Sequence, residues 1–243
     1  MLQKSRISKI KVYSEEWFSA RLGKFTSSEI SFIMGEKFDT LGCYSYIYRK
    51  VGEFMSGQAI KVEIENDYTR WGALHEAEAI RKFGKHFGLD FIVCQQLITE
   101  ENSRFGSTPD GLIVHRESLD GLQYEVSTLE VKCPPTFQNY IPLALCKTPQ
   151  DVKKVNSQYY WQVLDQMDNC DALMGYFVIY HPDLKKGNMN IVEFRKMQPT
   201  GIVFGKEIPY PLVSDIKLLK ERKKMAEQKF SIVKEELELM GSF

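Results

Sequence analysis

The first part of the chain has hydrophobic residues at helical spacing, separated by residues that begin or end helices. Ser14 is placed to cap a short helix that Gly23 ends, because its hydroxyl can accept a hydrogen bond from a free backbone N–H group. Further helices are expected from about 26 to 35, over 43–55 and over 68–87. This part is therefore predicted to be helical.

The middle of the chain changes to short apolar runs separated by turn residues, a pattern typical of strands. The expected strands cover 90–98, 110–115, 122–126, 127–133, 172–181 and 190–197. A helix over 151–168 lies between the fourth and fifth strands, and a long charged helix follows at about 214–240. Helices around a mixed central sheet make the expected fold class α/β, or α+β.

The composition indicates one globular domain. The chain has 243 residues, of which 43% are hydrophobic and 26% charged, so it can bury a core and is not expected to be disordered or fibrous. No internal repeat or Gly/Ser/Pro-rich linker divides it. We therefore expect a single domain over 1–243, with a helical N-terminal part (about 1–88) and a long C-terminal helix (about 214–240).

The sequence also indicates the compartment. No run of about 18 apolar residues could span a membrane, and no apolar core follows the charges of the N-terminal segment. The five cysteines are scattered and form no C-x-x-C pair, which argues against a disulfide framework or a cysteine-ligated cluster. We expect a soluble cytoplasmic protein that makes no membrane contact.

The charges are unevenly distributed, although the formal net charge is zero. Basic and acidic residues number nine and five in 1–50, nine and fourteen in 51–150, and fourteen and thirteen in 151–243. An acidic centre beside a basic segment suits a metal site next to an anion-binding surface, and a chance fluctuation on a solvated surface explains it equally well. Zero net charge argues against a protein that coats nucleic acid but leaves open an enzyme with a local DNA groove.

The most informative stretch joins a Pro-Asp-Gly turn at Asp110 to a Glu-Val-Lys strand. Side chains at i and i+2 of a strand share a face, so Glu130 and Lys132 project together while Val131 points into apolar packing. A hairpin between the two segments would place Asp110 beside Glu130. Two carboxylates and the Val131 carbonyl suit Mg²⁺, and Lys132 can position an attacking water or stabilise charge on phosphate. The alternative is an exposed Glu–Lys pair, because E-x-K alone is common.

A third carboxylate, Glu76, falls at the centre of an apolar face of the 68–87 helix that includes Ile80 and Phe83. A carboxylate in such a face is costly unless it is paired or bound to metal. Glu76 therefore requires a partner, which is either a metal site or an ordinary Arg or Lys.

The helix over 151–168 presents two different faces. Its apolar stripe consists of Tyr160, Val163, Leu164 and Met167. Its other side gathers Gln158, Gln162 and Gln166 with Tyr159 and Trp161. Glutamines among aromatic residues can orient a water or contact nucleic acid, or they can form an ordinary half-buried face.

Together these residues resemble the PD-(D/E)XK nuclease superfamily, and within it the lambda-exonuclease-like (YqaJ-type) phage recombination nucleases. The resemblance covers most of 14–196 and rests on five motifs in order. They are W-F-S-A-R-L-G-K-F-T-S-S-E at 17–29, W-G-x-x-H-E at 71–76, S-T-P-D-G at 107–111, L-E-V-K-C-P at 129–134 and Y-x-x-Q-V at 159–163. RecB-like nucleases usually have Q-x-x-x-Y where this chain has Q-V-L-D-Q, which favours the lambda-type branch.

The resemblance implies a restriction-endonuclease-like core and assigns roles to the residues above. Asp110, Glu130 and the Val131 carbonyl would hold Mg²⁺, for which Mn²⁺ can substitute. Glu76 would lie near a second ion. Lys132 would position or activate the nucleophilic water, and Gln162 would be the active-site glutamine of the family.

The resemblance also implies a pocket for the 5′-phosphate of DNA, formed by Arg21 and Ser28. Thr26, Ser27 and Ser28 open a predicted helix, where free N–H groups and hydroxyls favour phosphate, and Arg21 can supply a bidentate guanidinium. Read alone, without the resemblance, the segment is better explained as an ordinary capped helix junction.

The activity implied is Mg²⁺-dependent 5′-to-3′ digestion of linear double-stranded DNA in phage-type recombination, in a bacterial or phage-infected cell. The implied partners are double-stranded DNA ends, a single-strand annealing protein and further copies of the chain in a trimeric ring. An endonuclease of the same superfamily and a non-catalytic module that binds DNA or a recombination protein are the alternatives. The C-terminal helix has a coiled-coil-like seam that could pack on its own domain, on another subunit or on a partner. The seam consists of Leu219, Ala226, Phe230, Val233, Leu237 and Met240.

Overall fold

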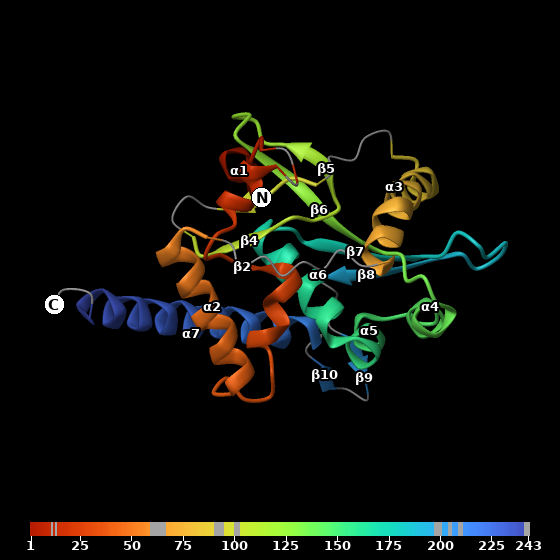
Figure 1. The fold of residues 1–243 in the computed structure, drawn as a ribbon. Helices are drawn as coiled ribbons and strands as arrows, with labels where there is room; N and C mark the ends of the chain where they lie inside the picture. Colours follow the sequence, from red (N-terminus) through yellow and green to blue (C-terminus); the bar gives the residue numbers. More distant parts are fainter. Residues whose placement is uncertain are drawn as a thin grey trace.

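The computed structural model describes residues 1–10, 12, 14–58, 67–89, 95–99, 103–196, 201–203, 206–208 and 211–240 (Figure 1). The elements of the N-terminal part are β1 (Leu2–Gln3), the 3-10 helix η1 (Lys4–Arg6), α1 (Glu15–Ala20), β2 (Phe25–Thr26), the 3-10 helix η2 (Ser27–Ile33), α2 (Leu41–Ser56) and α3 (Asp67–Phe87). The helical prediction for this part is confirmed, with one difference. The segment after Thr26 forms a tight 3-10 helix of seven residues rather than an α-helix.

Local capping explains where these helices begin and end. The Ser14 hydroxyl accepts from Trp17 N at 3.2 Å and starts α1, as the sequence predicts. Thr40 caps α2 by accepting from Cys43 N, and Gly57 ends α2 with a left-handed φ of 64°. The caps therefore come from the residue types that satisfy free backbone groups at helix ends.

Strand β6 (Gln123–Lys132) is the centre of the main sheet. It pairs antiparallel with β5 (Gly111–Glu117) along one edge, and along the other edge it pairs parallel with β7 (Met174–Tyr180) and antiparallel with β1. Strand β8 (Met189–Arg195) continues the sheet beyond β7. The division predicted between 122–126 and 127–133 is wrong, because no turn residue interrupts β6.

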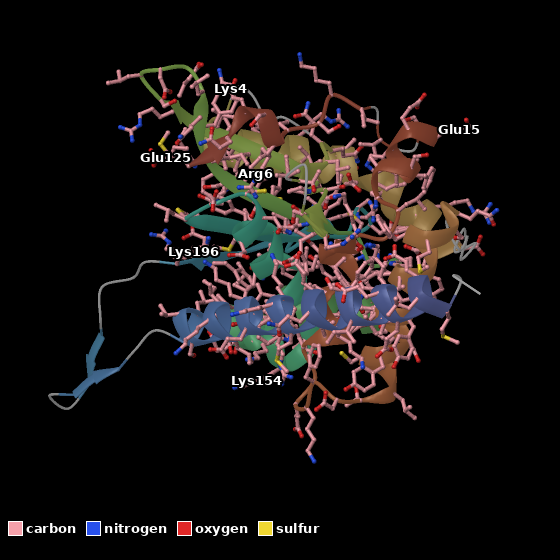
Figure 2. All side chains as sticks on the ribbon, turned by 90° about the vertical axis from the view of Figure 1, so that its left-hand side faces the viewer. Lys4, Arg6, Glu15, Glu125, Lys154 and Lys196 are labelled. Atoms are coloured by element: carbon pink, nitrogen blue, oxygen red, sulfur yellow. The ribbon has the colours of Figure 1, made fainter. Side chains whose placement is uncertain are left out.

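Two smaller sheets complete the strands. One consists of β2, β4 (Phe105–Ser107) and β3 (Ile98–Thr99), and the other of β9 (Gly201–Val203) and β10 (Lys206–Ile208). The β9–β10 hairpin projects away from the main body (Figure 2). The strand predicted over 90–98 lies mostly outside the described residues, and only its end is seen, as part of β3.

The main sheet has two apolar faces that alternate along each strand. Leu129 and Val131 of β6 pack with Ala79 and Phe83 of α3 on one face. Phe177 and Ile179 of β7 belong to the core on the opposite face, with the stripe residues of α6. Because side chains alternate with period two, Glu130 and Lys132 lie on the α6 side of the sheet. This mixed sheet between helices confirms the predicted fold class.

The helix predicted over 151–168 is two helices, α5 (Pro149–Val155) and α6 (Ser157–Asn169). The chain is extended at Asn156, whose side chain accepts from Tyr159 N and caps α6. The predicted apolar stripe of α6 is fully buried. A further helix, α4 (Phe137–Ala144), was not predicted, and it contains Pro142 in its last turn.

The last helix, α7 (Pro211–Met240), runs beside α2 in Figure 1. Leu219, Ala226 and Phe230 of its predicted seam are fully buried in the core. The end of the seam is different, because Leu237 and Met240 are exposed. The first part of the seam therefore packs on its own chain. Within the described residues, no helix combines the length and apolar character needed to cross a membrane.

Candidate active site

The β5–β6 hairpin brings Asp110 next to Glu130. Gly111 pairs with Leu129, so Asp110 lies opposite Glu130 at the open end of the hairpin. The Asp110 Oδ2 atom accepts a hydrogen bond from Val131 N at 2.7 Å. The pairing predicted from a hairpin between the two segments is therefore present in the fold.

Glu130 is almost fully buried, at 1% exposure, and donors hold both of its carboxylate oxygens. Its Oε1 atom accepts from Lys132 Nζ at 2.5 Å and from Gln162 Nε2 at 2.6 Å. Its Oε2 atom accepts from Gln166 Nε2 at 2.5 Å. The two glutamines stand one turn apart on α6, so the glutamine face of α6 covers the acidic end of β6.

Glu76 reaches the same site from α3. Its Oε1 atom accepts from Gln95 Nε2 at 2.6 Å, so its observed side-chain partner is an amide rather than the Arg or Lys considered from the sequence. Gln95 has a positive φ of 52°, a strained backbone conformation for a residue with a side chain. Local strain therefore accompanies the contact that holds Glu76.

The charges of the site affect one another. Burial raises the pKa of Asp110 well above its usual range, and the nearby charges of Glu130 and Glu76 add to this. Burial also raises the pKa of Glu76, while the hydrogen bond from Gln95 opposes the rise. Burial lowers the pKa of Lys132, but the charges of Glu130 and Asp110 outweigh it, so the pKa lies above its ordinary value.

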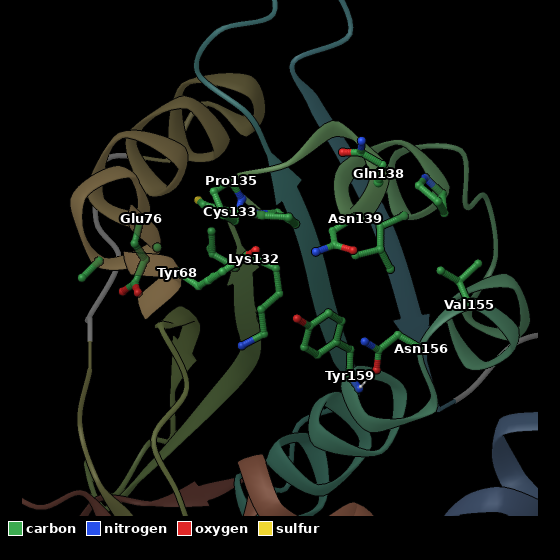
Figure 3. Close-up of a pocket in the computed structure, with 16 residues that line it drawn as sticks. Tyr68, Glu76, Lys132, Cys133, Pro135, Gln138, Asn139, Val155, Asn156 and Tyr159 are labelled. Atoms are coloured by element: carbon green, nitrogen blue, oxygen red, sulfur yellow. Dashed lines mark hydrogen bonds between the residues drawn. The ribbon is translucent and has the colours of Figure 1, made fainter. Parts of the chain in front are cut away.

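A cavity of about 740 Å³ opens beside these residues. Figure 3 shows Glu76 of α3 and Lys132 of β6 facing this cavity from one side and Tyr159 and Asn156 from the other. The Lys132 ammonium lies 5.2 Å from the centre of the Tyr159 ring, close enough for a cation–π interaction. The cavity gives an extended substrate access to both Lys132 and Glu76.

The donor set fits a hard divalent cation. Asp110, Glu130 and Glu76 provide carboxylate oxygens. The pKa values of Asp110 and Glu76 are raised first by burial and then by the neighbouring carboxylates, and a bound cation would offset both effects. Among the described residues, no three Asp, Glu, His or Cys side chains are arranged to hold a metal by themselves. A backbone carbonyl and water would have to complete the coordination, as is usual for Mg²⁺.

Of the predicted phosphate-binding residues, Ser27 and Ser28 begin η2 and Thr26 precedes it, next to α6, whereas Arg21 lies at the end of α1. Ser28 is exposed, and its carbonyl accepts from Gln158 Nε2 at 3.1 Å. Ser27 is buried, and its hydroxyl donates to Asp165 at 2.7 Å. Arg21 lies over the Trp17 ring at 4.0 Å. The buried hydroxyl of Thr26 lies 3.4 Å from that of Ser28 and donates to Glu29 at 3.4 Å.

Two contacts of the site were not assigned from the sequence. Gln166 was placed only on a mixed face, although its spacing of four from Gln162 could have indicated a shared target. Gln95 had no sequence signal, since it comes from a loop between α3 and β3 and reaches Glu76 only through the tertiary fold.

The chain was compared with known families, curated proteins and solved structures. The YqaJ-like viral recombinase domain family matches residues 16–172. No curated protein sequence matches the chain.

Among solved structures, the alkaline exonuclease LHK-Exo from Laribacter hongkongensis is 19% identical, with a TM-score of 0.69 over 94% of this chain and 98% of that one. LHK-Exo in complex with dAMP is 20% identical, with a TM-score of 0.63 over 93% and 100%. A phage-related exonuclease from Haemophilus somnus 129PT is 16% identical, with a TM-score of 0.60 over 88% and 96%. These likenesses support the fold, and because the family match spans more than half of the sequence, the chain belongs to the YqaJ-like viral recombinase domain family.

Proposed function

We propose that the protein is a Mg²⁺-dependent deoxyribonuclease that digests linear double-stranded DNA from the 5′ end in phage-type recombination. The observation that carries this proposal is the Glu130 cluster, in which a buried carboxylate, a lysine and two glutamines meet beside Asp110 and an open cavity. Membership of the YqaJ-like family and the fold shared with exonucleases support the same activity.

The chemistry follows from the groups that line the cavity and from Asp110 and Glu130 beside it. Asp110, Glu130 and the Val131 carbonyl would hold Mg²⁺ or Mn²⁺, with Glu76 beside a second ion. When bound, such ions lower the pKa of water and stabilise charge on phosphate oxygens. Lys132 faces the cavity, where it would position or activate the attacking water or stabilise charge on the phosphate.

The end preference is proposed from the position of the Arg21 and Ser28 segment relative to Glu130. Gln158 contacts the Ser28 carbonyl, and Gln162, four residues later on α6, contacts Glu130. Four residues of helix span about 6 Å, whereas B-DNA rises about 3.4 Å per nucleotide of one strand. A terminal phosphate near Ser28 would therefore lie within one or two nucleotides of the cleavage site.

The proposal includes the partners implied by the family. They are a single-strand annealing protein and further copies of the chain, arranged as a trimeric ring in the bacterial or phage-infected cell. Leu237 and Met240 at the end of α7 are exposed apolar side chains that such a contact could cover.

The test is digestion with Mg²⁺ of linear duplex with a 5′-phosphate, linear duplex with a 5′-hydroxyl, and closed circular DNA. We expect loss of the linear forms only, with the phosphorylated form fastest. Lys132→Met should lower the rate by about 10²–10³-fold, as for loss of one charge-stabilising donor, whereas the exposed Lys224→Met control should not. Arg21→Ala should reduce the advantage of the phosphorylated end, and Arg116→Ala, at the far end of the hairpin, should not.

Other outcomes would point elsewhere. Cutting of the circle would identify an endonuclease of the same superfamily. No cutting of any DNA, with metal still bound, would support the non-catalytic binding module instead.

A further inference from the structure

We propose that Gln166 is a positioning residue that holds the Glu130 carboxylate in the orientation that binds the cation. This inference rests on the metal-dependent function proposed above, and it concerns a residue whose contact with Glu130 emerges only in the fold. Gln166 is 1% exposed and lies in the last turn of α6, one turn beyond Gln162.

The hydrogen bonds to Glu130 are unequal at its two oxygens. Oε1 accepts from two donors, Lys132 and Gln162, whereas Oε2 accepts only from Gln166 within the part of the chain that the structure describes. A carboxylate oxygen has about two lone-pair positions. Two donors fill those of Oε1, and Oε2 retains one. Oε2 is therefore the oxygen of Glu130 available to a cation, and Gln166 is the donor that fixes its direction.

The orientation of the Gln166 amide follows from chemistry. A carboxylate only accepts hydrogen bonds, so the amide nitrogen must face Glu130 and the amide oxygen must face away. That oxygen is buried and has no hydrogen-bond partner among the described residues. A buried acceptor left unpaired costs free energy, on the order of 1–3 kcal/mol.

This cost separates a positioning role from a packing role. If Gln166 only filled space between α6 and β6, the protein would be more stable with an apolar side chain of similar length at this position. Instead, the amide nitrogen of Gln166 donates to Glu130, while its amide oxygen has no partner among the described residues. The contact resembles the outer hydrogen bonds that orient metal ligands in other proteins, whose loss typically weakens metal binding about 10–100-fold.

The experiment is calorimetric titration of the full chain with Mn²⁺ in the absence of DNA. Gln166→Met keeps the length of the side chain and removes its donor, and we expect the Mn²⁺ dissociation constant to rise about 10–100-fold. Gln162→Met should have a smaller effect, because Lys132 still donates to the same oxygen. The exposed Gln228→Met on α7 is the matched control and should bind Mn²⁺ like the unmodified protein.

A kinetic readout distinguishes positioning from direct chemistry. If Gln166 acts through metal binding, high Mn²⁺ should restore most of the cleavage rate of Gln166→Met at saturating DNA. The same addition should not restore Lys132→Met, which lacks a group that faces the cavity. If the methionine variant does not fold, Gln166→Asn can replace it in both measurements, because its side chain is one methylene shorter and its amide no longer reaches Glu130.

The outcomes are separable. A dissociation constant for Gln166→Met within about threefold of the unmodified value, with normal Mn²⁺ dependence of cleavage, would overturn the positioning role and leave the proposed nuclease intact. Absence of Mn²⁺ binding to the unmodified protein would overturn the metal-dependent function and this inference with it.

Discussion

Replacing Lys223 by methionine should destabilise the protein through charges that lie between α6 and α7. The Lys223 ammonium donates to Asp165 at 3.0 Å, to Asp168 at 3.0 Å and to the Asn169 side chain at 2.9 Å. Asp165 has no solvent exposure and also accepts from Ser27. Methionine retains most of the aliphatic length of the lysine, so the change removes mainly the positive charge.

The magnitude follows from the burial of the partners. Removing one member of a buried ion pair leaves an uncompensated charge and costs about 3–5 kcal/mol. The side chain of Lys223 is only 12% exposed and that of Asp165 is 0% exposed, so solvent screens little of this cost. For a protein of this size each kcal/mol lowers the melting temperature by roughly 2–4 °C. We therefore expect a decrease of about 6–20 °C.

Thermal unfolding followed by far-UV circular dichroism at pH 7 measures the effect. The double variant Asp165→Asn with Lys223→Met should recover part of the lost melting temperature, because it removes one of the buried negative charges left without a partner. Lys224→Met, an exposed neighbour on α7, is the control and should change the melting temperature by no more than about 2 °C, the usual limit for surface changes. If Lys223→Met also melted within that range, the cluster would not be the source of stability that we infer.

Two further predictions concern the same layer of the protein. Burial raises the pKa of Asp168, but Lys223, Lys220 and Lys196 outweigh this effect, so the pKa in the folded protein is lowered. Ionised Asp168 therefore stabilises the fold above the unfolded pKa of about 3.9, and this stabilisation is lost as pH falls through the lower folded pKa. Asp168→Asn should flatten an acid titration of unfolding free energy below about pH 4; an unchanged slope would contradict this. Gly175→Ala would place a methyl 2.8 Å from Met167 Sδ and 3.0 Å from Thr128 Oγ1, and should cost about 1–3 kcal/mol in urea unfolding. Unaltered stability would mean that the Met167 side chain moves aside without cost.

Most of the site could be predicted from the alternation of apolar and polar side chains along β6. Val131 had to face apolar packing, which fixed Glu130 and Lys132 on the opposite face. The hairpin between β5 and β6 then brought Asp110 to Glu130. These relations are local or depend on one hairpin, so sequence spacing is enough to predict them.

The errors arose where local sequence has no strong signal. The break at Asn156 separates α5 from α6 without Gly or Pro, and only the extended backbone and the cap reveal it. Helix α4 follows two prolines and contains a third, so helix propensity alone argues against it. The side-chain contact of Gln95 with Glu76 depends on a loop conformation that no periodic pattern encodes.

The direction of the β5–β6 hairpin has a consequence for how the protein can be altered. Asp110 and Glu130 lie at the open end of the hairpin, near Gly111, whereas Glu117 pairs with Tyr124 next to the connecting turn. The connecting turn includes Leu119, which is fully exposed. Extra residues inserted there would lengthen the loop without shifting strand register, whereas one residue inserted within β6 would reverse which side chains face α6. The turn is thus a place to attach a fluorophore or an affinity tag that leaves the acidic end of the hairpin untouched.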